Sequence, residues 1–264
     1  MHDHHKESIA KITAYFEADP TVMGLILTGS IAHGFDRADS DVDVLIVVSD
    51  DDFARRLETG KLTMVSPDLC TYEGGFVDAK YTCLSLINQT AEKGSEPARW
   101  AYDGAQLLFS RFDPPNILQN AIKNIASYQT EGKENRIMRF RVQLQIWRWY
   151  CSEGRKKNNP YLLNLAASKL VLFGGRLILA HNEMLYPFHK WFLRLLGDAP
   201  EKPEGFMDLV DRVIRDPTEA NTEHFFEVVA NWKEWATSPN RPGALYMVDS
   251  ELNWLYLQTP VDDL

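Results

Sequence analysis

The sequence predicts an α/β domain followed by an all-α domain, with the boundary between residues 112 and 113. Up to about residue 90, short apolar runs bounded by turn residues favour buried strands. Beyond that point, apolar residues recur at helical spacing instead. A length of 264 residues fits one large domain or two small ones. We therefore expect a mixed sheet with helices over residues 1–112 and a helical accessory domain over residues 113–264.

In the first domain, apolar residues at helical spacing predict an opening helix over residues 8–18, which Pro20 ends. A second helix is predicted over residues 51–58, and a turn with a short helix joins the first two strands. The predicted strands cover residues 22–28, 42–48, 62–65, 68–72 and 76–86.

In the second domain, Asp113 followed by Pro114 predicts a helix N-cap and first turn, with the helix ending near Tyr128. Further helices are predicted over residues 134–153, 160–181, 187–196, 204–214, 218–236 and 249–257.

The composition is that of a globular protein, with 45% hydrophobic and 25% charged residues. No uninterrupted apolar run reaches the length of a membrane span, because Lys169 and Arg176 interrupt the richest one, residues 161–180. The first residues are polar and rich in histidine rather than a secretory leader, and we expect a mobile N-terminus, a cytoplasmic location and no membrane partner. The odd number of cysteines, three, fits reduced core thiols.

Charge is unevenly distributed along the chain. The 28 basic and 37 acidic residues give a net charge of −9, yet residues 133–176 hold 10 basic and 2 acidic side chains. This segment favours a bound polyanion, or else a solvated helix face paired with acids, which is the simpler interpretation for most of the ten. Net acidity disfavours a nucleic-acid partner, although the basic segment leaves modification of RNA ends open.

One stretch, residues 25–48, carries a motif with chemical meaning. A strand ends at Thr28, Gly29 and Ser30 open a tight turn, ten residues intervene, and Asp41 and Asp43 begin the next strand. Because side chains alternate along a strand, both carboxylates lie on one face, about 7 Å apart, where a divalent cation relieves their repulsion. Such hard oxygen ligands suit Mg²⁺. Gly29 permits close backbone approach, and N–H groups at this turn with the Ser30 hydroxyl suit triphosphate oxygens.

The Gly-Ser turn, the spacer and the Asp-x-Asp strand resemble the signature of the nucleotidyltransferase fold of the DNA polymerase beta superfamily. With the Ser40-Asp41 pair, they are similar to bacterial antibiotic nucleotidyltransferases of the kanamycin and lincosamide type. The resemblance implies a third carboxylate on a later strand, for which Asp78 is the candidate, and covers residues 22–86. It implies two Mg²⁺ ions held by Asp41, Asp43 and Asp78 as the catalytic residues, with ATP or another nucleoside triphosphate as co-substrate.

Basic residues supply further candidates for nucleotide binding. Lys80 shares a strand face with Asp78 and either contacts phosphate or is an edge charge. Lys169 and Arg176 stand seven residues apart on one face of an apolar helix, and their burial would need an anionic partner. That partner is either the triphosphate or an internal acid. The general base is Asp78 or an acid of the helical domain, for which Glu183 is a guess. The nucleotide-binding candidates are Gly29, Ser30, Ser40, Lys80, Lys169 and Arg176.

These features predict an enzyme that moves a nucleoside monophosphate, AMP from ATP in the first instance, onto a hydroxyl of a small molecule. The net acidity suits a cationic acceptor such as an aminoglycoside-like antibiotic. One alternative is AMP transfer to a protein side chain. Another is a nucleotidyltransferase-fold protein that acts by binding, as an antitoxin or a regulatory partner. The acceptor, the nucleotide preference and the oligomeric state stay open.

Overall fold

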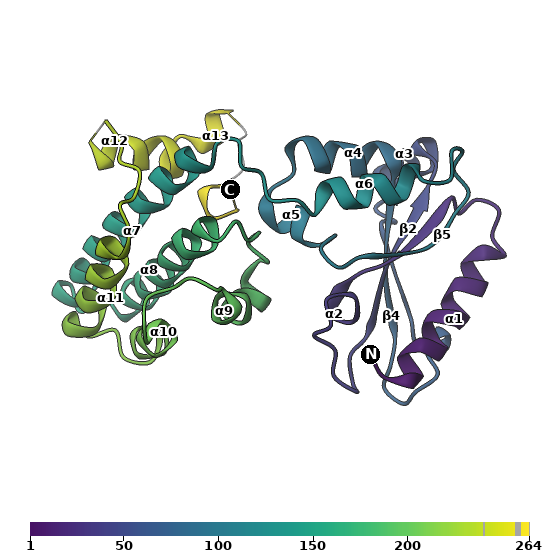
Figure 1. The fold of residues 1–264 in the computed structure, drawn as a ribbon, viewed down its shortest axis with the longest axis horizontal. Coiled ribbons are helices and arrows are strands. Elements are labelled where there is room, and N and C mark those ends of the chain that lie inside the picture. Colours follow the sequence, from purple (N-terminus) through teal and green to yellow (C-terminus); the bar gives the residue numbers. More distant parts are fainter. Residues whose placement is uncertain (240, 257–259, 264) are drawn as a thin grey trace. The chain divides into compact units, whose positions relative to one another are not determined.

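The computed structural model describes residues 1–239, 241–256 and 260–263, and the chain divides into two compact units, Met1–Ser127 and Tyr128–Leu264. Figure 1 shows a mixed sheet with helices in the first unit and helices in the second, which confirms the predicted fold class. The division lies after the predicted boundary at 112–113, because helix α6 (Ile117–Ile125) packs on the sheet. Its Leu118 and Ile122 share one hydrophobic cluster with Ile26 of the sheet.

The sheet of the first unit has five strands in the order β3-β4-β2-β1-β5. β2 and β4 run parallel, and the other neighbours pair antiparallel. The strands are β1 (Gly24–Leu27), β2 (Val42–Val48), β3 (Thr63–Ser66), β4 (Val77–Cys83) and β5 (Gln106–Ser110). β5 was not predicted. The strand predicted over residues 68–72 does not form, because the chain turns into a short 3-10 helix at Pro67–Leu69.

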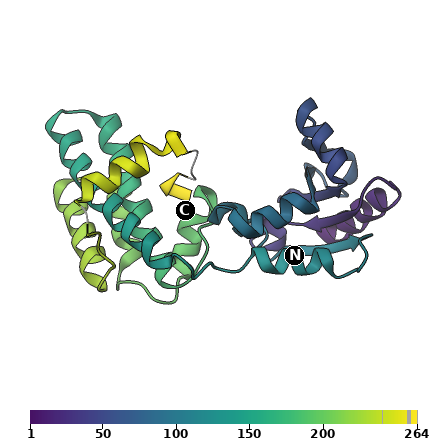
Figure 2. The same cartoon turned by 90° about the horizontal axis from the view of Figure 1, so that it is seen from above.

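Alternating side chains give the sheet two apolar faces. On one face, Val44 of β2 packs in a cluster with Ile12 of helix α1 (Asp3–Glu17). On the other face, Val47 packs with Ile87 of helix α4 (Leu84–Lys93) and with α6. Figures 1 and 2 show α1 on the opposite side of the sheet from α4 and α6. Burial of both faces makes the sheet a rigid support for side chains at the ends of its strands.

Three shorter helices complete the first unit: α2 (Gly29–Ala32), α3 (Asp50–Thr59) and α5 (Glu96–Trp100). α3 begins at Asp50, one residue before the predicted start, because the Ser49 side chain accepts the Asp52 N–H at 3.2 Å as an N-cap. α6 begins at Ile117, so the predicted cap at Asp113 does not start the helix.

The second unit contains two long helices, α7 and α8, which follow each other in the chain and pack antiparallel. Shorter helices cover them (Figure 1). Asn159 caps α8, since its side chain accepts the Leu162 N–H at 3.1 Å, and Pro160 occupies the first turn. The helices are α7 (Lys133–Lys156), α8 (Pro160–His181), α9 (His189–Asp198), α10 (Phe206–Arg215), α11 (Glu219–Trp232), α12 (Pro242–Tyr246) and α13 (Asn253–Tyr256). The predicted helix over 249–257 is divided between a π-helical turn at Met247–Glu251 and α13, and Leu257 lies outside the described residues.

α8 has the length and apolar composition of a membrane span, with a mean hydropathy of 1.6 over 18 residues. However, 67% of that window is buried inside the structure. Phe173 and Leu177 of α8 are fully buried and pack with Phe140 of α7. Its hydropathy is therefore explained by its place in the core of the helical unit.

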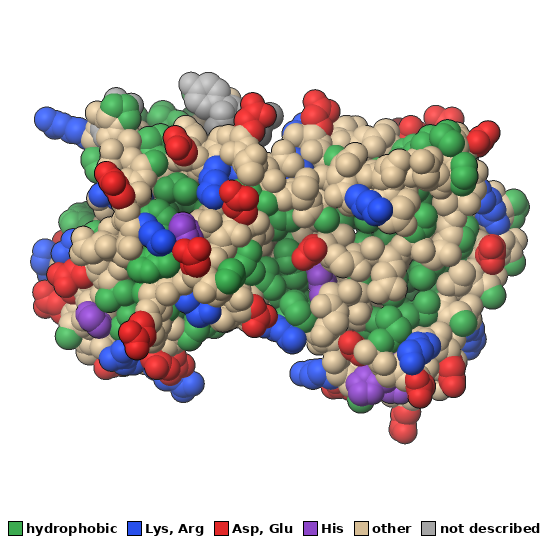
Figure 3. Space-filling model, in the orientation of Figure 1, with side chains coloured by type: hydrophobic (Ala, Val, Ile, Leu, Met, Phe, Trp, Pro, Cys, Tyr) green, Lys and Arg blue, Asp and Glu red, His purple; other side chains and the backbone are tan. Residues whose placement is uncertain are grey.

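The basic segment of residues 133–176 pairs largely with acids of the helical unit. Arg139 contacts Asp249 at 2.7 Å, and Arg148 is paired with Glu223. Figure 3 shows acidic and basic side chains interspersed over the visible face of this unit. For these residues the structure shows the simpler of the two interpretations, a helix face paired with acids.

Candidate active site

The pairing of β2 with β4 brings two of the predicted carboxylates side by side. In this parallel pair, Asp43 lies opposite Asp78 and Val42 lies opposite Val77, on strands that neighbour each other at about 4.8 Å. Val42 and Val77 face the core that α1 covers, so the two aspartates face the other side. Asp41, two residues before Asp43, is half-buried just before β2 begins. Asp43 and Asp78 thus lie opposite each other near the start of both strands, and Asp41 directly precedes β2.

The Gly-Ser turn lies against the same carboxylate. Gly29 has a φ of +67°, and a Cβ built on it would lie 1.9 Å from the Asp43 Oδ2. The Thr28 N–H donates to the Asp43 backbone oxygen at 3.0 Å, which holds the end of β1 beside the start of β2. Ser30 is 7% exposed. Only glycine permits both the positive φ and this close approach.

Ser40 and Tyr72 shape the loop that leads to Asp41. The Ser40 hydroxyl accepts the Arg37 N–H at 2.9 Å, and the Tyr72 hydroxyl donates to the Ser40 backbone oxygen. Burial, the Cys70 thiol and the Asp41 charge raise the pKa of Tyr72 to about 12, so the hydroxyl keeps its proton and its donor role at neutral pH. Ser40 therefore has a structural role in the loop besides the predicted contact with nucleotide. Tyr72 was missed because it lies in a segment predicted as a strand.

His4 and His5, near the N-terminus, also contact the loop that leads to Asp41, at Ala38 and Asp36. His5 is fully buried, and its Nδ1 lies 3.3 Å from the Asp36 Oδ2, which the N-terminal ammonium of Met1 also contacts at 3.3 Å. His4 Nε2 lies 3.0 Å from the Ala38 backbone oxygen. The expected mobile terminus is therefore the start of α1, packed against the loop that carries the first carboxylate.

The pKa values of His5 and Asp36 are both lowered, for different reasons. Burial, and next the charge of His4, lower the pKa of His5, while Asp36 opposes them. Burial acts to raise the pKa of Asp36, but the hydrogen bond and charge of the N-terminal ammonium outweigh it, and the pKa lies below its usual value. The ionised Asp36 is thus held mainly by the chain's own amino group.

The ring of His33, the residue that follows helix α2, stacks on the ring of Trp100. The rings of His33 and Trp100 lie 3.8 Å apart and nearly parallel, at 14°. Burial lowers the pKa of His33, with the Asp103 charge opposing the shift, so the imidazole is neutral at pH 7. Gly104 permits close contact here, because a Cβ on it would lie 2.8 Å from the Ala32 backbone oxygen. His33 lies within the motif stretch, three residues after Ser30. Trp100 lies far from that stretch in the sequence, and no sequence pattern indicated its contact with His33.

The basic candidates divide between the two units. Lys80 is exposed on the same strand face as Asp78 in the first unit. Lys169 and Arg176 belong to the helical unit, where the Lys169 Nζ lies 2.5 Å from the Asp262 carboxylate. The Arg176 guanidinium donates to the Asp262 backbone oxygen. The structure therefore gives both residues a partner within the chain, which for Lys169 is the internal ion pair that was one of two alternatives.

Arg176 is more deeply buried than Lys169, the other basic candidate on α8. It is 1% exposed, and its guanidinium lies 4.4 Å from the ring centres of Phe140 and Tyr186. Glu183, the guess for a general base, forms an ion pair with Lys133 at 2.8 Å in the same unit.

Residues 9–74 match the family model described as a nucleotidyltransferase domain. This range contains Gly29, Ser30, Ser40, Asp41 and Asp43, and it ends before Asp78. Residues 9–74, within the first unit, are therefore a nucleotidyltransferase domain. The class of enzyme that this domain supports is a nucleotidyltransferase, and the activity that it supports, in general terms, is nucleotide transfer.

Among solved structures, the chain is similar to a nucleotidyltransferase-like protein from Exiguobacterium sibiricum 255-15. The identity is 10% and the TM-score 0.47, with 86% of this chain and 73% of that chain covered. No curated protein matches the sequence.

The donor set of the site suits a divalent cation that is completed by substrate. Within residues 1–239, 241–256 and 260–263, no three acids, histidines or cysteines converge as a ready-made metal group. Mg²⁺, however, is commonly bound by one or two carboxylates together with substrate phosphates rather than by an all-protein cage. Asp41 and Asp43 offer hard oxygen donors, and the Asp43 carboxylate lies against the Gly29 backbone. The residues therefore fit a metal that enters with the nucleotide.

Proposed function

We propose that the protein transfers a nucleoside monophosphate, AMP from ATP in the first instance, to a hydroxyl group of a small-molecule acceptor. The observation that carries this proposal is the contact between the Asp43 carboxylate and Gly29, with Asp78 opposite Asp43 on the adjoining strand. A carboxylate therefore lies directly against the Gly-Ser turn, and a second acid lies opposite it on the adjoining strand.

The residues would divide the chemistry between them. Asp41 and Asp43, with Asp78, would hold two Mg²⁺ ions, which when bound supply positive charge to the phosphates and lower the pKa of the acceptor hydroxyl. Gly29 and Ser30 would receive the β- and γ-phosphates, and Lys80 would add charge at the same strand face. Asp78 would accept the hydroxyl proton as the acceptor oxygen forms a bond to the α-phosphorus. The bond from that phosphorus to the β-phosphate oxygen breaks, and pyrophosphate leaves.

The acceptor that the charge distribution favours is a cation. Residues 1–132 hold 11 basic and 20 acidic side chains, so this part of the chain attracts positively charged molecules. An aminoglycoside-like antibiotic has both the cationic groups and the hydroxyls that such a reaction needs. We propose this class of acceptor for the first screen.

The test starts with nucleotide binding and continues with turnover. Isothermal titration with ATP, GTP, CTP and UTP, with and without Mg²⁺, is run on the wild type and on Asp43→Asn. Binding that requires Mg²⁺ and weakens in the variant supports the site. Pyrophosphate release is then measured with cationic aminocyclitols, neutral sugars and a protein lysate as acceptors. Absence of binding by all four nucleotides would overturn the proposal and favour a protein that acts by binding a partner.

A further inference from the structure

A cavity of about 860 Å³ opens within the helical unit, and the nucleotidyl-transfer proposal gives it no role. α7 forms one wall with Lys133, Ile137 and Arg141, which recur every four residues along one helix face. Trp235 and the end of α8 at His181 form the others. The volume lies within the range typical of small-molecule sites.

Arg141 lacks the acidic partner that most arginines and lysines of this helix have. It is half-buried, and its Nε is buried without a hydrogen-bond partner. Across the part of the chain that the structure describes, Arg141 forms no ion pair. A buried guanidinium N–H without a partner costs free energy, and an anion paired with the same guanidinium would offset that cost. The planar fork of arginine matches a carboxylate or a phosphate.

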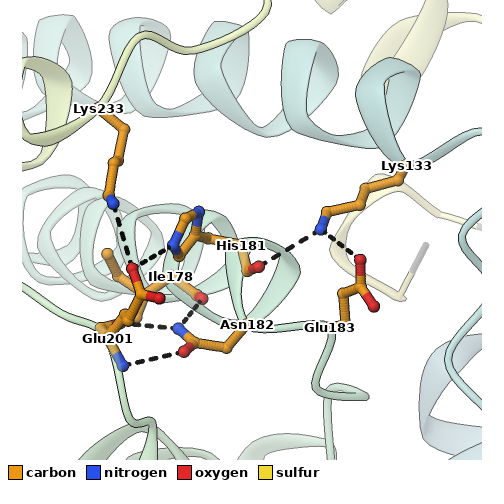
Figure 4. Close-up of polar contacts among 7 residues, drawn as sticks. All are labelled: Lys133, Ile178, His181, Asn182, Glu183, Glu201 and Lys233. Carbon is orange, nitrogen blue, oxygen red and sulfur yellow. Dashed lines mark hydrogen bonds and ion pairs between the residues drawn. The ribbon is translucent and has the colours of Figure 1, made fainter.

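The polar wall beside Arg141 is held in place by its own contacts (Figure 4). Lys233 Nζ and His181 Nε2 both contact the Glu201 carboxylate, at 3.1 and 2.9 Å. The bonds from His181 and Lys233 lower the pKa of Glu201, so it stays ionised. Asn182 fixes the Glu201 backbone with two hydrogen bonds, at 2.7 and 2.9 Å. Lys133 is bonded to Glu183 in the same way.

These contacts pair both lysines with acids, whereas Arg141 has no acidic partner among the described residues. The lining also contains apolar side chains, Ile137 and Trp235 among them. Trp235 is 6% exposed, and its indole N–H already donates to the Val229 backbone oxygen at 2.8 Å, which leaves its ring as the surface available. Glu134 and Glu234 also line the cavity as exposed acids, which disfavours a polyanion.

We propose that this cavity binds a small molecule with one compact oxyanion, a carboxylate or a phosphate monoester, attached to a ring or another apolar body. The oxyanion pairs with the guanidinium of Arg141, and the apolar body packs against Ile137 and Trp235. Every lining residue belongs to the helical unit, so the proposal stands apart from nucleotide transfer.

The experiment uses the full-length protein without divalent cations. Phenyl phosphate, benzoate and neutral phenol are titrated while the indole N–H signal of Trp235, assigned with Trp235→Phe, is followed by NMR. We expect saturable shifts with one or both anions and a far weaker response to phenol. Whichever anion binds more tightly identifies the group. Arg141→Gln should weaken that binding about 10- to 100-fold, as loss of a charged hydrogen bond does.

Arg215→Gln is the matched control, because Arg215 is an exposed arginine of the same unit paired with Asp211, and it should leave binding unchanged. Asp43→Asn should also leave it unchanged. Arg141→Lys keeps the charge but loses the fork, and should bind with intermediate affinity if the fold is intact by circular dichroism. Equal affinity in wild type and Arg141→Gln, no saturable shift with either anion, or loss of binding in Asp43→Asn alone would each overturn the proposal.

Discussion

The carboxylate of Asp43 occupies the space above Gly29 that any other residue would fill with its Cβ, 1.9 Å from Oδ2. We expect Gly29→Ala to remove nucleotide transfer and to lower the free energy of unfolding by more than the roughly 1–3 kcal/mol that a positive φ alone costs. Gly34→Ala is the control, because Gly34 has a φ of +72° with open space around it. Urea unfolding and pyrophosphate release measure both. Equal losses in the two variants would show that the contact with Asp43 is irrelevant.

Asp43→Asn keeps the shape of the side chain and removes its charge. Because a metal ligand stabilises charge in the transition state, we expect turnover to fall by at least about 100-fold while the fold stays intact. The control is Asp39→Asn, an acid of the preceding loop that is 73% exposed and paired with Arg37. Single-turnover pyrophosphate release distinguishes them. Near-normal turnover in Asp43→Asn would remove the basis of the metal assignment.

His5 makes stability depend on pH. Its pKa in the folded protein lies below the ordinary value of 6.5, so the unfolded chain binds the proton more tightly. Stability is therefore fully present above pH 6.5 and declines as the pH falls below it. We expect urea midpoints to drop between pH 7.5 and 5.5, and to drop less in His5→Gln. Some dependence should remain in that variant, because the pKa of His33 is lowered as well. An identical decline in wild type and His5→Gln would contradict this account.

Arg176 and Lys169 should differ in what they contribute. Arg176→Met leaves the Asp262 carbonyl without its donor inside the helical unit, and we expect a loss of about 1–3 kcal/mol of unfolding free energy. Lys169→Met breaks a partly exposed ion pair and should cost less than about 1 kcal/mol. Thermal or urea unfolding gives the comparison. A weaker affinity for nucleotide with unchanged stability would instead support the phosphate contact that the sequence left open.

The parts of the fold that follow from short-range patterns were predicted well. β2 and α8 agree closely with the predicted ranges, because a dense apolar strand and an Asn-Pro cap are local signals. β5 was missed because its ends, Gln106 and Ser110, are polar and it pairs at an edge of the sheet. Its pairing with β1 joins residues 79 to 86 positions apart in the chain.

In the candidate site, too, local motifs could be predicted from the sequence and long-range contacts could not. The Gly-Ser turn and the Asp-x-Asp strand could be identified from a motif of fixed spacing, but the contact between Gly29 and Asp43 was not predicted. The contact of His5 with Asp36 and that of Tyr72 with Ser40 join segments about 30 residues apart, and no periodicity records them. The partner of Lys169 lies 93 residues away, so the choice between phosphate and internal acid needed the structure.

The position of β5 late in the first unit also determines how long a fragment must be to fold into this unit on its own. A fragment that ends near residue 100 would leave β1 as an unpaired edge with the apolar sequence Gly24–Leu27, and such edges recruit other chains. It would also lack α6, which covers one face of the sheet. On the ribosome, the domain cannot complete its sheet until residue 110 has emerged, long after the family motif. An excised catalytic domain should therefore extend to Ser127.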